Sequence, residues 1–423
     1  MQKLSADSQA ATADPHPPVF LDEVEEHRSK IKDKKQKQKA MKTLLKMLLG
    51  LAVGVVIGLG IAYLIIILID GPDAMENLKT KDVGIGELAL SVAVTFVALI
   101  VAVVIQFALH ETGHALGGLA TGFRFLSIRL FKFAIVRDTD GKLRYKKFSI
   151  AGTGGQCLMD FGREREPKDI PYFWYNAGGV VMNILSAVVA IIMLRTSDLS
   201  MVGETFCMMT AFAAILLGGM NGIPLTLNGL SNDGRNIMLL WRDKKARVFF
   251  FRMMQMAGGL SRGERLKDMP AEWFEDVKPR DKDHYFAISN RLNFMTWLED
   301  QGRYSEARAV CEELDGIEKL PQLLCMEKNA DHIMLELLTT GRKDVVDRIL
   351  TKQTMRYLEA NKAYSPMKTA ALFAVNLLCL NDKAKADTLY EELLAKKNDY
   401  LMPGEALMAI EMAERIKLAE KKG

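Results

Sequence analysis

The chain has 423 residues, enough for more than one domain, and 49% of them are hydrophobic. Its 56 basic and 52 acidic residues nearly cancel, which argues against a dedicated nucleic-acid-binding protein. The 5 cysteines are scattered without a CxxC pair, so the sequence predicts neither a disulfide framework nor a cysteine-based zinc site.

The N-terminal segment 1–43 is polar at first and then strongly basic. It contains prolines and acidic residues followed by closely spaced lysines, and no apolar stretch of the kind found in a cleavable signal peptide. A segment of this composition cannot bury a hydrophobic core. We expect residues 1–43 to form a disordered basic arm that stays in the cytosol and leads into a membrane anchor.

Four apolar segments have the length of a membrane-spanning helix, which needs about 20 residues. The second has no charged residue between Leu88 and Leu109, and we expect its helix to continue to about Leu119. The sequence therefore predicts an α-helical integral membrane protein. Its predicted transmembrane helices are residues 47–69, 88–119, 172–194 and 206–227.

The distribution of Lys and Arg predicts how these helices are oriented. Cytosolic loops of membrane proteins carry an excess of positive charge. The arm 1–43 and the loop 120–171 are rich in Lys and Arg, whereas the loops 71–86 and 195–205 are not. The two basic segments are therefore expected in the cytosol, together with both termini. We expect a multi-pass protein of a bacterial cell membrane.

Between the second and third spans the pattern changes to that of β-strands. Aromatic and branched residues alternate from Arg124 to Val136, and Asp138 to Gly141 is a turn signal. Residues from Lys142 onward read as a returning strand. The sequence therefore predicts a small cytosolic β-hairpin at 123–150, followed by a flexible stretch that contains Gly154 and Gly155.

The C-terminal part of the chain is predicted to be cytosolic and helical. A helical linker at 241–284 follows the membrane domain 44–240. In the segment 285–423, helix–turn–helix units align on turns spaced 39 and 40 residues apart. This fixed period favours an α-helical repeat domain of the solenoid type. An ordinary helical bundle with coincidental spacing is the alternative. The turns are Gly302-Arg303, Gly341-Arg342 and Asn381-Asp382.

A His-Glu-x-x-His motif, formed by His110, Glu111 and His114, ends the second apolar run. On a continuous helix the two histidines lie at i and i+4 on one face, where their imidazoles can share one Zn²⁺. Glu111 can then act as general base for the water that attacks a substrate. Ionisable groups at membrane depth are costly and usually functional. The motif therefore predicts a zinc hydrolase with one Zn²⁺ per chain.

A catalytic zinc site needs a third protein ligand in addition to an open position for water. Asp233 follows the fourth span on the same side of the membrane as the histidines, and we predict that it is this ligand. Asp138, Asp140 and Asp160 are the alternatives. They lie on the same side, but in a loop that we expect to be mobile.

Over residues 88–240 these motifs together resemble the site-2 protease family of intramembrane zinc metalloproteases. The resemblance implies that His110, His114 and Asp233 bind zinc and that Glu111 is catalytic. Gly154-Gly155 is similar to a Gly-Gly element that is thought to hold the substrate as an added strand. The other matching residues are Gly179 to Asn183, Asn221-Gly222-Ile223-Pro224 and Asp233-Gly234.

The chain departs from the family pattern at two places. Val180 stands where the family often has proline, and the spacing of 12 between Asn221 and Asp233 is that of one branch of the family. Asn183 and Asn221 are expected to give polar support or to bind substrate. Hydrogen bonding between helices is the alternative role for both.

We therefore expect an intramembrane zinc endopeptidase that cleaves transmembrane or membrane-inserted substrates. Such a substrate must present an extended backbone, and pairing with the hairpin edge could supply it. The alternative for the hairpin is a membrane-surface anchor. The alternatives for the whole chain are an inactive zinc-binding membrane scaffold that acts through its helical repeats, and a transporter or channel. Membrane lipids and a protein bound to the repeats are expected partners, and nucleic acid is not.

Overall fold

The computed structural model describes residues 85–148, 154–162, 165–167, 170–227, 230–274, 285–317 and 320–420, with Gly58, Gly60 and Ile67. The predicted basic arm 1–43 lies outside the described residues. So does the predicted span 47–69, apart from those three single residues. From Ile65 onward the chain forms one unit by its internal contacts.

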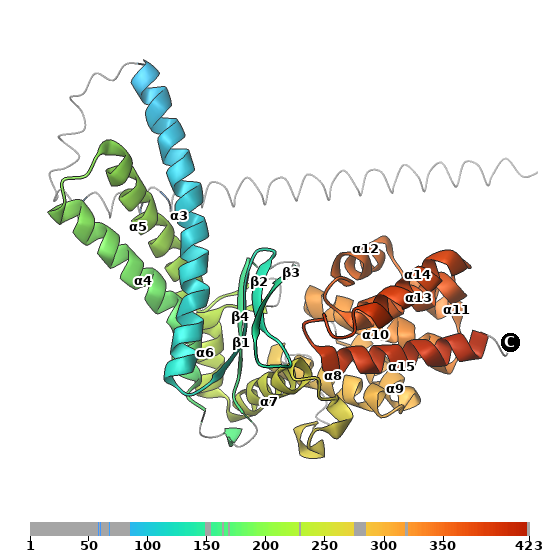
Figure 1. Cartoon of the computed structure of the whole chain (residues 1–423). Coiled ribbons are helices and arrows are strands. Elements are labelled where there is room, and N and C mark those ends of the chain that lie inside the picture. The colour runs from blue at the N-terminus through green and yellow to red at the C-terminus, as the bar shows by residue number, and fades with distance from the viewer. Residues whose placement is uncertain are drawn as a thin grey trace, which may run out of the picture. The chain divides into compact units, whose positions relative to one another are not determined.

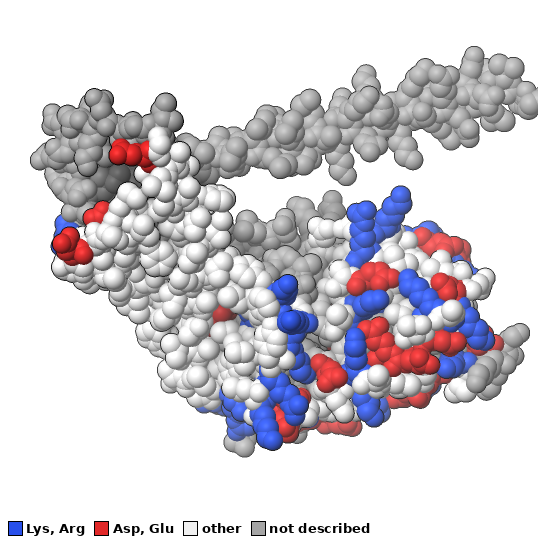
Figure 2. Space-filling model, turned by 45° about the horizontal axis from the view of Figure 1, so that its top comes forward, with Lys and Arg blue, Asp and Glu red and all other residues white. Residues whose placement is uncertain are grey.

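Three described helices are long and apolar enough to cross a membrane, namely α3 (Ile85–Ala120), α4 (Tyr172–Thr196) and α5 (Met201–Gly222). They pack against one another and lie side by side in Figure 1. Many of their large apolar side chains face outward, such as Phe96 (63% exposed) and Val189 (56% exposed). Figure 2 shows a broad surface without Lys, Arg, Asp or Glu over this part of the molecule. Such a surface is consistent with a membrane protein.

The boundaries of these helices follow from local sequence. α3 continues through the histidine motif, as predicted, and ends where Gly122 adopts a φ of +82°. α4 agrees with the predicted span 172–194. The predicted span 206–227 is displaced, because α5 begins at Met201 and ends at Gly222. Ser200 caps the first turn of α5 by accepting a hydrogen bond from the Gly203 N–H, and proline follows shortly after its end.

Helices α3 and α4 approach closely because glycines line their contact. A Cβ added at Gly113 would lie 2.2 Å from the carbonyl oxygen of Gly178, and one at Gly117 would lie 2.2 Å from that of Trp174. Only glycine permits this spacing between the two backbones. Because Gly113 lies inside the histidine motif, the close packing sets the position of both histidines relative to α4.

The predicted hairpin 123–150 is part of a larger antiparallel sheet. Its strands are β1 (Arg124–Leu130), β2 (Phe133–Arg137), β3 (Leu143–Lys147) and β4 (Gly155–Asp160), in the spatial order β3-β2-β1-β4. The predicted turn before Lys142 is present, with Gly141 at a φ of +80°. The stretch 124–136 is two strands rather than one. The chain reverses at Phe131, whose φ is +52°, a turn without the usual glycine or asparagine signal.

After α5 the chain continues through a short ribbon and two helices. The ribbon pairs β5 (Thr226–Leu227) with β6 (Leu230–Ser231). Helix α6 (Asp233–Arg242) follows at once, and α7 (Lys244–Ser261) packs against β4. One buried cluster joins Phe123, Phe161 and Tyr175 to Leu240 and Phe250, so it ties α6 and α7 to the base of α4.

The remaining described chain is helical, as predicted. The expected turns are present, with positive φ angles at Gly302, Gly341 and Asn381. An extra helix, α12, interrupts the predicted pairs. One core cluster runs through this part of the chain. Its helices are α8 (Tyr285–Asp300), α9 (Tyr304–Asp315), α10 (Gln322–Thr339), α11 (Lys343–Ile349), α12 (Lys352–Asn361), α13 (Pro366–Leu378), α14 (Lys383–Ala395) and α15 (Pro403–Glu420).

Candidate metal centre

His110 and His114 lie one turn apart on α3, with their side chains turned toward each other. Both are buried, and their Nε2 atoms are 3.1 Å apart. The rings meet edge to face at an angle of 87°. This arrangement follows from the i, i+4 spacing on a continuous helix. It leaves two imidazole nitrogens pointing at one position.

Asp233, the first residue of α6, supplies a third group at the same position. Its Oδ2 lies 3.0 Å from His110 Nε2 and 3.4 Å from His114 Nε2. No hydrogen bond within the described residues satisfies this buried oxygen. Burial raises the pKa of Asp233, but the positive charges of protonated His114 and His110 outweigh it and lower the pKa to about 2 when no metal is bound. The side chain is therefore a carboxylate, the form that binds a metal.

The outer nitrogen of each histidine has a fixed partner. His114 Nδ1 lies 2.7 Å from the carbonyl oxygen of Tyr175, which can only accept a hydrogen bond. His110 Nδ1 lies 2.7 Å from Asn183 Oδ1, another acceptor. Both Nδ1 atoms must therefore carry hydrogen, so Nε2 is the nitrogen of each ring that can bind a metal.

The orientation of Asn183 is itself fixed by α3. Its amide nitrogen donates to the Oε1 of Gln106 at 2.8 Å and to the Gln106 carbonyl at 3.2 Å. The Gln106 amide donates in turn to the Ser186 hydroxyl at 2.7 Å. Because the nitrogen of Asn183 is used in this way, its oxygen faces His110. Such outer hydrogen bonds orient metal ligands and increase their basicity.

These groups fit a bound metal ion. The ligand atoms of His110, His114 and Asp233 all lie within 4.8 Å of one another. When both imidazoles are neutral, as metal ligands must be, their Nε2 lone pairs and the carboxylate oxygen repel one another unless a cation lies between them. Two imidazoles and one carboxylate form a donor set that suits zinc, and they leave a tetrahedral ion one open position.

Glu111 is buried beside this cluster and contacts the start of β4. A Cβ added at Gly155 would lie only 2.2 Å from Glu111 Oε1. Gly179 has a similar role for His110, because a Cβ there would lie 2.6 Å from the imidazole. Glycine at these positions therefore makes room for the general-base candidate and for one metal ligand.

The structure brings only some of the other predicted site residues to the cluster. Asn183 contacts the cluster, whereas the Asn221 amide donates to Leu217 of its own helix, at 3.1 Å. Gly154 packs against the ring of Phe107, one turn before Glu111. The alternative third ligands are engaged elsewhere. Asp138 and Asp140 pair with Arg144, and Asp160 pairs with Arg262.

Apart from Asn183, sequence reasoning missed the residues that position the ligands. Gln106 is the one amide side chain in the uncharged run before the motif, and a polar residue at membrane depth was an available signal. Asn232 caps α6 by accepting from the Arg235 N–H, and donates to the Met220 and Ile223 carbonyls at the end of α5. It therefore fixes where Asp233 begins α6. Tyr175 acts through its carbonyl, which no side-chain pattern reveals.

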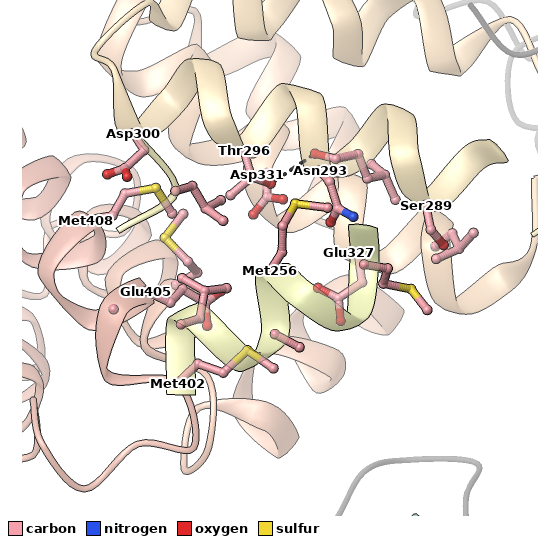
Figure 3. A pocket seen from close by; sticks show the side chains of 18 of the residues that line it. Met256, Ser289, Asn293, Thr296, Asp300, Glu327, Asp331, Met402, Glu405 and Met408 are labelled. Carbon is pink, nitrogen blue, oxygen red and sulfur yellow. Dashed lines mark hydrogen bonds between the residues drawn. The ribbon is translucent and has the colours of Figure 1, made fainter. Parts of the chain in front are cut away.

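A cavity of about 270 Å³ lies between α7 and the helices α8, α10, α13 and α15. Figure 3 shows the side chains of Asp331, Glu327 and Glu405 around it, with methionines between them. None of the metal-cluster residues lines this cavity, so it is separate from the candidate metal centre.

Comparison with known proteins identified no match. No family model, no curated protein and no solved structure matches this chain.

Proposed function

We propose that the protein is an intramembrane zinc endopeptidase of the site-2 protease type. The observation that carries this proposal is the convergence of His110 Nε2, His114 Nε2 and Asp233 Oδ2 at the end of an apolar helix of spanning length. The two Nε2 atoms that face this point and the buried carboxylate oxygen without a hydrogen-bond partner support a metal between them. Glu111, buried next to this point, supports hydrolysis, because a structural metal site needs no general base.

The roles of the side chains follow from their positions. Zn²⁺ held by the three ligands would supply Lewis-acid activation of water and of the scissile carbonyl. Glu111 takes the proton of the attacking water and delivers it to the leaving amine. Asn183 and the Tyr175 carbonyl keep the two imidazoles in the tautomer that can bind the metal. Gly155 keeps Glu111 in reach of the reacting atoms.

The substrate is proposed to pair with β4. β3 and β4 are the two edges of the sheet, and Glu111 contacts the first residue of β4. Further along β4, the Cys157 carbonyl accepts a hydrogen bond from the Tyr175 hydroxyl at 2.7 Å. We therefore place the substrate at the stretch near Gly155, which lies beside the general base. An extended transmembrane or membrane-inserted peptide added there keeps its scissile bond unfolded next to the metal.

The membrane arrangement in this proposal has four spans, with 47–69 as the first. Both termini are cytosolic, in a bacterial cell membrane. The sheet region, which is rich in Lys and Arg, and the loop 197–200, which has neither, lie at opposite ends of the described spans. This distribution of positive charge supports the orientation. The C-terminal helices act as a solenoid-like surface for a protein partner.

Two measurements test the proposal. Purified protein should contain one Zn²⁺ per chain by elemental analysis, and His110→Ala should lose it. Glu111→Gln should keep the zinc but lower turnover by roughly 10²–10⁴-fold. Turnover is measured by comparing membrane peptides from cells that carry the intact protein or Glu111→Gln. Full zinc in His110→Ala would exclude the ligand assignment. Unchanged peptides would favour a zinc-binding scaffold instead.

A further inference from the structure

Helix α6 has an apolar face that is packed at its first turn and becomes exposed toward its end. Gly234, Ile237, Met238 and Trp241 follow the i, i+3, i+4, i+7 spacing and therefore share one face of the helix. They line an open groove of about 500 Å³, and Trp241 is 67% exposed. The helix packs elsewhere through Leu240, which is fully buried. α6 is therefore apolar on two sides, and the side that lines the groove is packed at Gly234 but open at Trp241.

The other walls of the groove come from the ends of two spans. Tyr172 and Phe173 begin α4, and Gly222 and Pro224 lie at the end of α5. Phe173 is 47% exposed. The outer faces of the same helices expose apolar side chains further along, and in a membrane such side chains face acyl chains or another spanning helix. The groove thus lies at the ends of two helices whose outer faces are apolar.

The order of residues after the groove matches a membrane–water boundary. Trp241 is followed by Arg242, Lys244 and Lys245, all of them exposed. Trp and Tyr gather at the headgroup level of bilayers, and Lys or Arg next to them interact with anionic headgroups. A helix with an apolar aromatic face and basic residues at its end lies in the plane of the interface.

We propose that α6 is a membrane-surface helix and that its groove holds an acyl chain of a bilayer phospholipid, with Trp241 at the headgroup level. This arrangement goes beyond the proposed protease function, because it requires neither a metal nor turnover. It also has a consequence for the metal centre. Asp233 begins α6, and a Cβ added at Gly234 would lie 2.1 Å from the Gly222 carbonyl oxygen. Helix α6 and the end of α5 are thus in direct contact at Gly234, the residue that follows the proposed third ligand Asp233.

The 4 tryptophans of the chain allow a direct test. Trp241 lines the groove, and Trp174 (55% exposed) follows the groove residue Phe173 on α4. Trp273 is buried, and Trp297 stacks on Phe274. The full-length protein is reconstituted in vesicles of phosphatidylcholine and phosphatidylglycerol. Part of the phosphatidylcholine carries bromine near the glycerol end of its acyl chains. The readout is the fraction of tryptophan fluorescence that the brominated lipid quenches.

Brominated lipid should quench a distinct component of the emission. Trp241→Phe should remove much of this component, whereas the matched variant Trp297→Phe should leave it intact. Iodide in the surrounding water should quench Trp241 only weakly. If the lipid-quenched component is the same in Trp241→Phe and the intact protein, α6 does not face lipid. Strong iodide quenching of Trp241 would place this face in water and would also overturn the proposal. Neither outcome depends on zinc or on cleavage.

Discussion

Asn183 joins His110 to Gln106 and thereby links a metal-ligand candidate to a polar residue one turn earlier on the same helix. The distances are 2.7 Å from His110 Nδ1 to Asn183 Oδ1 and 2.8 Å from the Asn183 amide to Gln106 Oε1. The link crosses from α3 to α4 and is fully buried at Asn183. It therefore sets the tautomer and the rotation of the His110 ring at the same time.

Replacing Asn183 by Ala should weaken metal binding by about 10–100-fold, because His110 loses the acceptor that fixes its Nδ1 hydrogen. Metal affinity is measured by competition with a chelator in detergent. Asn221→Ala is the matched control, since the Asn221 amide bonds only within its own helix in the described structure. Equal affinities for the two variants would show that Asn183 does not orient the ligand.

Gly155→Ala should lower cleavage while leaving the metal content unchanged. The added methyl group would lie 2.2 Å from Glu111 Oε1, so the carboxylate must move. Displacement of a catalytic group by about 1 Å can reduce the rate by about 10²-fold. Both the rate of substrate cleavage and the zinc content are measured.

Gly219→Ala provides the control for this substitution. Gly219 lies on α5, and a Cβ there meets no atom within 4 Å. It should keep both zinc and activity. If Gly155→Ala lost zinc, the defect would lie in the fold of the site rather than in the placement of Glu111.

The sequence was sufficient to predict the metal cluster but not what holds it in place. The uncharged run before His110 predicts a helix that continues into the motif. Asp233 could be chosen because topology brings it to the same side of the membrane. The link from Asn183 to Gln106 depends on how α3 and α4 are rotated against each other, which apolar periodicity does not determine.

The sheet was predicted only in part for a similar reason. Gly154-Gly155 has the composition of a loop, yet Gly155 begins β4 because only glycine fits against Glu111. The turn at Phe131 has no glycine and gives no signal in the sequence. Tertiary contacts determine the backbone conformation at both positions, so local β-propensity does not predict it.

A photo-cross-linking residue at position 156 should capture substrate, because Gln156 is exposed on β4 next to Gly155. The experiment uses the Glu111→Gln background, in which bound substrate is not consumed. The same cross-linker at Tyr145, which is 58% exposed on the opposite edge strand β3, is the control. Cross-linking is followed by mass shift of a tagged substrate. A product at 145 alone would place the substrate on β3.

The stability of the helical part should fall as the pH rises toward 8. Burial raises the pKa of Glu405 to about 7, although Lys368 opposes this, and burial likewise raises the pKa of Asp331 to about 6. Glu327 also faces this group and forms an ion pair with Lys368. Because the folded state binds these protons more tightly than the unfolded chain, the stabilisation is complete below about pH 4 and is lost as the pH rises through 6 to 7.

Glu405→Gln should remove part of this pH dependence, because the neutral amide resembles the protonated acid. At pH 8 the variant should be more stable than the intact protein by on the order of 1–3 kcal/mol, and at pH 5 the difference should shrink. The melting temperature of the full-length protein in detergent is compared at both pH values. Asp387→Asn, at an exposed position on α14, is the control and should leave the pH profile unchanged. A parallel shift of the Glu405→Gln curve at both pH values would mean that titration of Glu405 is not the cause.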